Sequence, residues 1–214
     1  MKNRFLLWSL LLAALGLAAT LLVWQQLPER VPVHWSLAGA ADAWRPRGWL
    51  FAPPAVLLLA ALLWRVLPGV SPARFGVDGF ERTWWFCGMA VSVLLAAIHG
   101  MLLWGALGGA MAIETVLPAG LGLFVVLVGN VMGKVRRNFW LGVRTPWTLA
   151  DERVWYVTHR LAGKTMVTGG LLAIVFAAAG LPPAAAIGVL LPGTLAPAAY
   201  SLLAYRRQVR AAGH

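Results

Sequence analysis

Long apolar runs separated by short polar segments dominate the hydrophobic pattern of this chain. A run of about 20 apolar residues can cross the hydrocarbon core of a bilayer as an α-helix. Six runs have this character: Phe5–Gln26, Trp49–Leu67, Trp84–Leu107, Val116–Met132, Leu161–Leu181 and Ala184–Tyr205. Because lipid offers the backbone no hydrogen-bond partner, each run should satisfy its own backbone as a helix. The pattern therefore predicts an all-α integral membrane bundle of about six transmembrane helices, without strands.

The composition supports a membrane protein and argues against a soluble enzyme. Hydrophobic residues make up 60% of the 214 residues, and charged residues only 12%. A soluble domain normally carries about 25% charged residues. A chain this apolar could not cover its surface with polar side chains, so we expect most of that surface to face lipid.

The net charge of +11 would suggest nucleic acid in a soluble protein, but here it indicates orientation. With a cytoplasmic N-terminus and six crossings, 15 of the 18 Lys and Arg residues fall on the cytoplasmic side: Lys2, Arg4, Arg65, Arg74, Arg82, Lys134, Arg136, Arg137, Arg144, Arg153, Arg160, Lys164, Arg206, Arg207 and Arg210. Only Arg30, Arg45 and Arg47 remain outside. Positive charge accumulates on the cytoplasmic side of membrane proteins. We therefore expect both termini in the cytoplasm of a bacterium, in its inner membrane, and no direct nucleic-acid partner.

The first run could instead be a cleaved signal peptide, because Lys2 and Arg4 precede it and small residues follow near Ala18. The apolar stretch reaches Trp24, which exceeds the roughly 7 to 15 residues of a signal-peptide core. An uncleaved first helix is the better interpretation. Cys87 is the only cysteine, which excludes an intramolecular disulfide and a cysteine-based metal site.

Two polar segments stand out between the helices and suggest a two-part organisation. We expect residues 1–83 to form a two-helix region whose outer loop covers residues 27–48. Residues 84–214 should form a four-helix region whose inner motif spans residues 129–164. The remaining connections look short and structural.

The outer loop carries the first group of candidate ligand-binding residues: Pro32, His34, Trp35, Gly39 and Asp42. Imidazole and carboxylate groups are common metal ligands and proton carriers, so His34 with Asp42 or Glu29 could form a metal site or an acid–base pair. The alternative is that His34 donates to a backbone carbonyl and only shapes the loop. We expect no bound metal and no cofactor.

The inner motif carries the second group: Asn130, Arg136, Asn138, Arg144, Pro146, Trp147, Trp155, Thr158, His159 and Lys164. Thr148 followed by Asp151 resembles a capping box and predicts a helix that begins near Leu149. Trp155 and His159 would share a face of this helix, which should run along the membrane interface before entering it. The arginines could bind anionic lipid or an acidic protein, or serve topology alone.

Both segments resemble the SdpI family of bacterial membrane immunity proteins. The N-terminal likeness, to a domain of unknown function that commonly precedes the SdpI region, rests on Leu27-Pro28, Pro32, His34, Gly39 and Asp42. Ser36 and Ala38 stand where that family often has asparagine. The C-terminal likeness rests on Gly129-Asn130, Lys134, Arg136, Asn138, Gly142, the run from Arg144 to Leu149, Trp155, Thr158-His159-Arg160 and Gly163-Lys164. Arg137 replaces a proline that is frequent there.

The resemblance implies protection against a secreted toxic peptide, and a possible second role in holding a cytoplasmic repressor at the membrane. Two other functions remain open at this stage. A transporter could use His99, Asn130 and Thr168 along a path, although no helix centre carries the acid that coupled carriers usually need. A membrane enzyme could use His34, Asp42, Glu29 or His159, but no known catalytic motif surrounds them.

Overall fold

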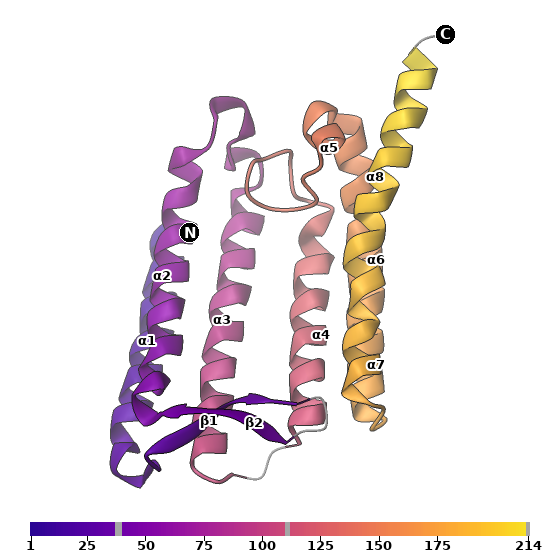
Figure 1. Ribbon diagram of the computed structural model, residues 1–214. Coiled ribbons are helices and arrows are strands. Elements are labelled where there is room, and N and C mark those ends of the chain that lie inside the picture. Colours follow the sequence, from indigo (N-terminus) through magenta and orange to yellow (C-terminus); the bar gives the residue numbers. More distant parts are fainter. Residues whose placement is uncertain (37–39, 110–111, 213–214) are drawn as a thin grey trace.

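The computed structural model describes residues 1–36, 40–109 and 112–212, and it is a bundle of long helices (Figure 1). Six helical spans among the described residues are long and apolar enough to cross a membrane, which confirms the predicted number. The long helices are α1 (Lys2–Leu22), α2 (Ala52–Val66), α3 (Glu81–Ala106), α4 (Ile113–Met132), α6 (Glu152–Ala178) and α8 (Leu190–Ala212). Two short helices, α5 (Pro146–Ala150) and α7 (Pro183–Gly188), precede α6 and α8. Short 3₁₀ turns extend α2 at both ends.

Large apolar side chains cover the outside of the bundle. Leu22 is 82% exposed, and Leu7 and Leu21 are each 62% exposed along α1. A soluble protein rarely exposes a contiguous apolar surface of this extent. The structure therefore describes a multi-pass membrane protein whose outer surface faces lipid.

The helices pack as two groups of three. Helices α1, α2 and α3 contact one another, as do α4 and α6 and then α6 and α8 (Figure 1). Buried polar side chains link α1 to α3: the Ser9 and Ser92 hydroxyls lie 3.0 Å apart, and Thr20 Oγ1 lies 3.1 Å from His99 Nε2. Such pairs satisfy polar groups that lipid cannot.

Glycines set the close packing of α4 against α6. A Cβ atom at Gly122 would lie 2.7 Å from the Gly170 carbonyl oxygen, and one at Gly170 would lie 2.5 Å from the Gly122 oxygen. A Cβ at Gly129 would lie 2.7 Å from that of Met166. Small residues allow membrane helices to approach to backbone contact. Gly122, Gly129 and Gly170 therefore lie directly at the crossing of α4 and α6.

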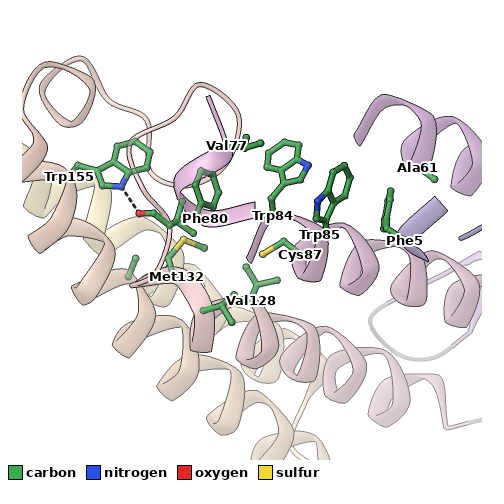
Figure 2. Close-up of a cluster of buried hydrophobic side chains, with 13 residues drawn as sticks. Phe5, Ala61, Val77, Phe80, Trp84, Trp85, Cys87, Val128, Met132 and Trp155 are labelled. Carbon is green, nitrogen blue, oxygen red and sulfur yellow. Dashed lines mark hydrogen bonds between the residues drawn. The ribbon is translucent and has the colours of Figure 1, made fainter. Parts of the chain in front are cut away.

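An aromatic cluster joins the two groups. Figure 2 shows Trp155 of α6 at one side of it, Phe80 and Trp84 in the middle, and Phe5 of α1 at the other side. Trp84 is fully buried and lies against Phe80 and Trp64 with ring centroids 6.5 Å and 4.7 Å away. We call this set the aromatic cluster. It fixes the inner motif of the C-terminal group against the first helix of the chain.

The segment between α1 and α2 corrects the expectation of a strand-free chain. Strands β1 (Arg30–Trp35) and β2 (Ala41–Pro46) form an antiparallel hairpin in which Pro32 faces Trp44. The sequence suggested a loop for residues 27–48. Pro32 cannot donate a backbone hydrogen bond to a strand ladder. In a two-stranded ribbon both strands are edges, so the missing N–H need not leave a neighbouring strand unpaired. The bundle itself is helical as predicted, and the hairpin is a local addition.

The hairpin and the inner motif lie at opposite ends of the bundle. The two strands cross one end, whereas α5 and the C-terminal end of α8 lie at the other (Figure 1). This separation matches the two polar segments expected from the sequence.

Candidate functional site

The inner motif, residues 129–164, consists of the end of α4, a folded loop of residues 133–145, α5 and the first turns of α6. Asn138 organises the loop from a fully buried position. Its amide nitrogen donates to the Arg136 and Leu141 carbonyls at 2.8 and 2.9 Å, and its oxygen accepts from the Trp140 and Leu141 N–H groups at 2.8 and 2.7 Å. All four hydrogen-bonding positions of the amide are filled. Asn138 therefore replaces the backbone pairing that a helix or sheet would supply.

His159 and Trp155 fix this loop to α6. The two rings stack with centroids 4.0 Å apart, as their predicted spacing on one helix face requires. His159 Nδ1 donates to the Trp155 carbonyl at 2.8 Å, and Nε2 accepts from the Val143 N–H at 3.0 Å. Trp155 Nε1 donates to the Val135 carbonyl at 2.8 Å, the dashed line in Figure 2. This assignment of donors makes the imidazole neutral and leaves it no free nitrogen for catalysis or metal binding.

Gly142 is required for the histidine to reach the loop. Its φ of +111° is unfavourable for residues with a side chain, and a Cβ there would lie within 2.2 Å of His159 Nε2. The sequence showed Gly142 as a glycine within the motif. Its contact with His159 could be identified only from the three-dimensional structure.

Two threonines and a serine hold α5 against α8. Thr145 caps α5: its Oγ1 accepts from the Thr148 N–H at 3.3 Å, and Thr148 Oγ1 accepts from the Thr145 N–H at 2.9 Å. Trp147 Nε1 donates to the fully buried Ser201 hydroxyl of α8, which also lies 3.2 Å from Thr145 Oγ1. Pro146 occupies the first turn of α5, where its missing N–H is tolerated. Ser201 was not among the predicted residues, because a serine in an apolar run gives no sequence signal of its own.

The predicted capping box was wrong in its residues. Thr148 pairs with Thr145, three residues before it, and Asp151 caps a different helix, accepting from the Val154 N–H at 2.9 Å. The helix that carries Trp155 and His159 is α6, which begins at Glu152, three residues after Leu149, and continues to Ala178 without a break. The short helix α5 precedes it. Proline at the start of α5 and the extended backbone of Asp151 divide what the sequence suggested was one helix start into two.

The arginines of the motif differ in their surroundings. Arg137 donates to the Leu149 and Ala150 carbonyls at 3.1 and 3.3 Å, so it ties the loop to α5. Arg144 is exposed and donates to the Phe139 carbonyl at 2.5 Å. Arg136 is also exposed. Arg136 and Arg144 therefore keep charge accessible on the surface of the inner motif.

Three predicted residues stand apart from this network. Thr158 is fully buried and its hydroxyl has no hydrogen-bond partner among the described residues. Asn130 of α4 and Lys164 of α6 are exposed and have no part in the hydrogen bonds described above. The structure thus brings most of the motif into one unit, and it places Asn130 and Lys164 on a different surface.

The outer hairpin brings His34 and Asp42 together across its two strands. His34 Nδ1 lies 2.5 Å from Asp42 Oδ1, and the side chains are 68% and 46% exposed. The carboxylate, and not a backbone carbonyl, is the partner of the imidazole. Among residues 1–36, 40–109 and 112–212, no group of three or more His, Cys, Asp or Glu side chains is placed to hold a metal ion. Gly39 lies outside the described residues.

Apolar contacts seat the hairpin on the bundle. Val31 and Leu50 are fully buried, and Leu27 and Leu103 complete the same cluster. The Trp35 ring lies so close to α3 that a Cβ at Gly105 would be 3.0 Å from it. Pro32 is buried, whereas His34 and Asp42 remain accessible. The hairpin is therefore a fixed platform that presents a polar pair at one end of the molecule.

These features define a multi-pass helical membrane protein with a structured motif at each end. Residues 134–205 match the SdpI/YfhL protein family, and residues 11–58 match a domain of unknown function, DUF1648. The chain is also similar to the immunity protein SdpI of Bacillus subtilis (strain 168), with 28% identity over 167 residues that cover 78% of each protein. These matches confirm the resemblance expected from the two motifs. No solved structure matches the chain.

Proposed function

We propose that this chain is an immunity protein of the bacterial inner membrane that protects its host against a secreted antimicrobial peptide. The similarity to the Bacillus subtilis immunity protein carries the proposal, because it extends over 78% of the chain and therefore over more than one motif. The family matches at residues 11–58 and 134–205 support it from both halves. The proposed function requires no catalytic step.

In this proposal the hairpin faces outward and the inner motif faces the cytoplasm. The hairpin and the turn after it carry Arg30, Arg45 and Arg47, whereas the other 15 cationic residues belong to the termini, the opposite connections and the helices that lead into them. Positive charge accumulates on the cytoplasmic side. A peptide arriving from outside would then meet the seated hairpin with its His34–Asp42 pair.

A toxin-challenge assay tests the proposal directly. The full chain is expressed in a bacterium sensitive to membrane-active secreted peptides, and growth is measured over a concentration series of each peptide. We expect a raised inhibitory concentration for at least one peptide and unchanged sensitivity to unrelated antibiotics. Equal sensitivity with and without the protein, across the peptide panel and at verified membrane expression, would reject the function.

A matched pair of substitutions tests the part assigned to the hairpin. Asp42→Asn removes the charge that pairs with His34, whereas Glu29→Gln removes one acid just before β1, the strand that carries His34. We expect Asp42→Asn to lower protection more than Glu29→Gln at equal protein levels. Equal protection by both variants and the wild type would remove the His34–Asp42 pair from the recognition surface.

The inner end offers a surface for a cytoplasmic protein partner such as a repressor. A hollow of about 510 Å³ is lined by Lys134, Arg136, Arg137 and Arg153 and by one acid, Glu152. This charge balance favours an acidic partner surface. Co-purification of the full chain with a regulatory protein encoded by a neighbouring gene tests this part of the proposal. Arg136→Glu should abolish the association, while toxin protection stays measurable in the same cells.

A further inference from the structure

A groove on the outside of the bundle, between α4 and α6, is not explained by the proposed function. It is an open hollow of about 600 Å³ near the inner end of both helices. The lining residues used below are Asn130, Gly133, Arg160, Gly163, Lys164 and Thr168, and we call it the α4–α6 groove. It contains the two motif residues, Asn130 and Lys164, that the inner loop does not use.

Glycines make the floor of this groove. A Cβ atom at Gly163 would lie 3.0 Å from the Gly129 carbonyl oxygen, so the two helices are in backbone contact there. At Gly133 a Cβ would meet only Arg160 Cγ, at 3.9 Å. The helices therefore touch at the bottom while their long side chains stand along the two walls, which leaves a concave surface open to the membrane.

The walls carry cations that lack a carboxylate partner. Arg160 and Lys164 both line the groove, and no Asp or Glu is among its described lining residues. Arg160 donates to the Tyr156 hydroxyl at 2.7 Å, a neutral partner. No salt bridge or hydrogen bond joins Lys164 to another described residue. Asn130 and Thr168, both exposed, add neutral donors to the lining of the groove.

The depth of these groups fits the boundary between lipid headgroups and acyl chains. Lys164 follows Glu152, the first residue of α6, by 12 positions in the sequence. At 1.5 Å per residue the helix rises about 18 Å over that distance. The whole of α6 would be about 40 Å long, which exceeds the roughly 30 Å of hydrocarbon, so its first turns lie outside. Lys164 therefore starts inside the hydrocarbon and extends its ammonium toward the phosphate level, one turn below Arg160.

We infer that the α4–α6 groove binds one anionic phospholipid of the inner leaflet. Lys164 and Arg160 hold its phosphate by charge-assisted hydrogen bonds. Asn130 and Thr168 donate to its ester oxygens, and an acyl chain follows the glycine floor past Val167. The anion supplies the countercharge that the groove itself lacks. This inference does not depend on the immunity function, because it concerns binding alone.

Native mass spectrometry of the full chain tests the site. The protein is purified in a neutral detergent and titrated with phosphatidylglycerol or, separately, with phosphatidylcholine. We expect one phosphatidylglycerol to remain bound under activation that removes phosphatidylcholine. Lys164→Gln should weaken this retention about tenfold, as loss of a charge-assisted hydrogen bond predicts, and Lys164→Arg should restore it.

Arg207→Gln is the matched control, because this exposed cation lies at the same end of the bundle on α8 and outside the groove. Gly133→Leu is a second test that fills the groove without changing charge. Each variant is first checked for an unchanged size-exclusion profile and thermal midpoint. Where a variant fails this check, Thr168→Val is tested in its place, because it removes a hydroxyl that donates to the lipid ester oxygens and should also weaken lipid retention. We expect Arg207→Gln to bind like the wild type and Gly133→Leu to lose the lipid.

Two results would overturn the inference. Equal weakening by Lys164→Gln and Arg207→Gln would mean that net charge alone attracts the lipid. Displacement of the bound lipid by millimolar inorganic phosphate would mean that the groove binds a free anion, without recognition of the acyl chains.

Discussion

At the scale of single residues, the inner motif depends on side chains that take the place of backbone hydrogen bonds. Asn138 serves four backbone groups, and His159 serves two more while stacking on Trp155. An unpaired buried donor or acceptor costs about 1 to 3 kcal/mol, so such residues tolerate little change. The sequence identified both as candidates, but it could not distinguish a residue that shapes the loop from one that binds a ligand.

Gly142→Ala tests the contact between the loop and His159. The positive φ and the 2.2 Å approach to His159 Nε2 leave no room for a methyl group. We expect the free energy of unfolding to fall by about 1 to 3 kcal/mol, seen as a lower thermal midpoint in detergent. Gly69→Ala is the control, because a Cβ there meets nothing within 4 Å. A wild-type midpoint for Gly142→Ala would contradict the described geometry.

Arg144→Lys separates positioning from topology. The substitution keeps the positive charge but loses the planar guanidinium that donates to the Phe139 carbonyl. We expect unchanged membrane insertion and protein level together with impaired protection or signalling. Arg74→Lys is the matched control, since Arg74 is an exposed cation outside the inner motif and outside the hollow proposed for the partner protein. If Arg144→Lys matched the wild type in both protein level and phenotype, Arg144 would contribute only to the orientation of the chain in the membrane.

At the scale of elements, lengths were easier to predict than boundaries. The membrane spans follow from apolar runs because lipid leaves the helix as the only local solution. The start of α6 was misplaced because Thr145, Thr148 and Asp151 are all good capping residues, and only the fold decides which helix each one caps. The hairpin was missed because its pairing depends on contact of Val31 with the bundle, which is not a local property.

Asp151→Ala tests the assigned helix start. Loss of the bond from the Val154 N–H should destabilise the protein by about 1 kcal/mol, the usual cost of removing an N-cap. Glu152→Ala, at the neighbouring exposed acid, should have a smaller effect on the thermal midpoint. If the two substitutions had equal effects, α6 would begin elsewhere.

At the scale of the whole molecule, the distribution of Lys and Arg residues predicts how the chain is oriented in the membrane. The arrangement of the helices alone does not determine this orientation. The helix number was predictable from the sequence alone, whereas the grouping of α3 with α1 and α2 was not. Side-chain contacts such as Ser9 with Ser92 decide that grouping, and they join positions 83 residues apart.

Cysteine labelling of intact cells tests the proposed orientation. In the full chain, a cysteine introduced at Ser36 should react with an impermeant maleimide before the membrane is permeabilised. A cysteine introduced at Arg136 should react only afterwards. Native Cys87 is buried, so the unmodified chain serves as the blank. Reversed labelling of the two positions would invert the topology.

The placement of the aromatic cluster has a mechanical consequence. The cluster joins the two groups of helices where Trp155 and Phe5 approach α3, close to the inner motif (Figure 2). The hairpin is seated at the far end of the bundle, on α3 and the ends of α1 and α2. A force applied to the hairpin would therefore act far from the aromatic cluster, and the cluster lies beside the loop held by His159.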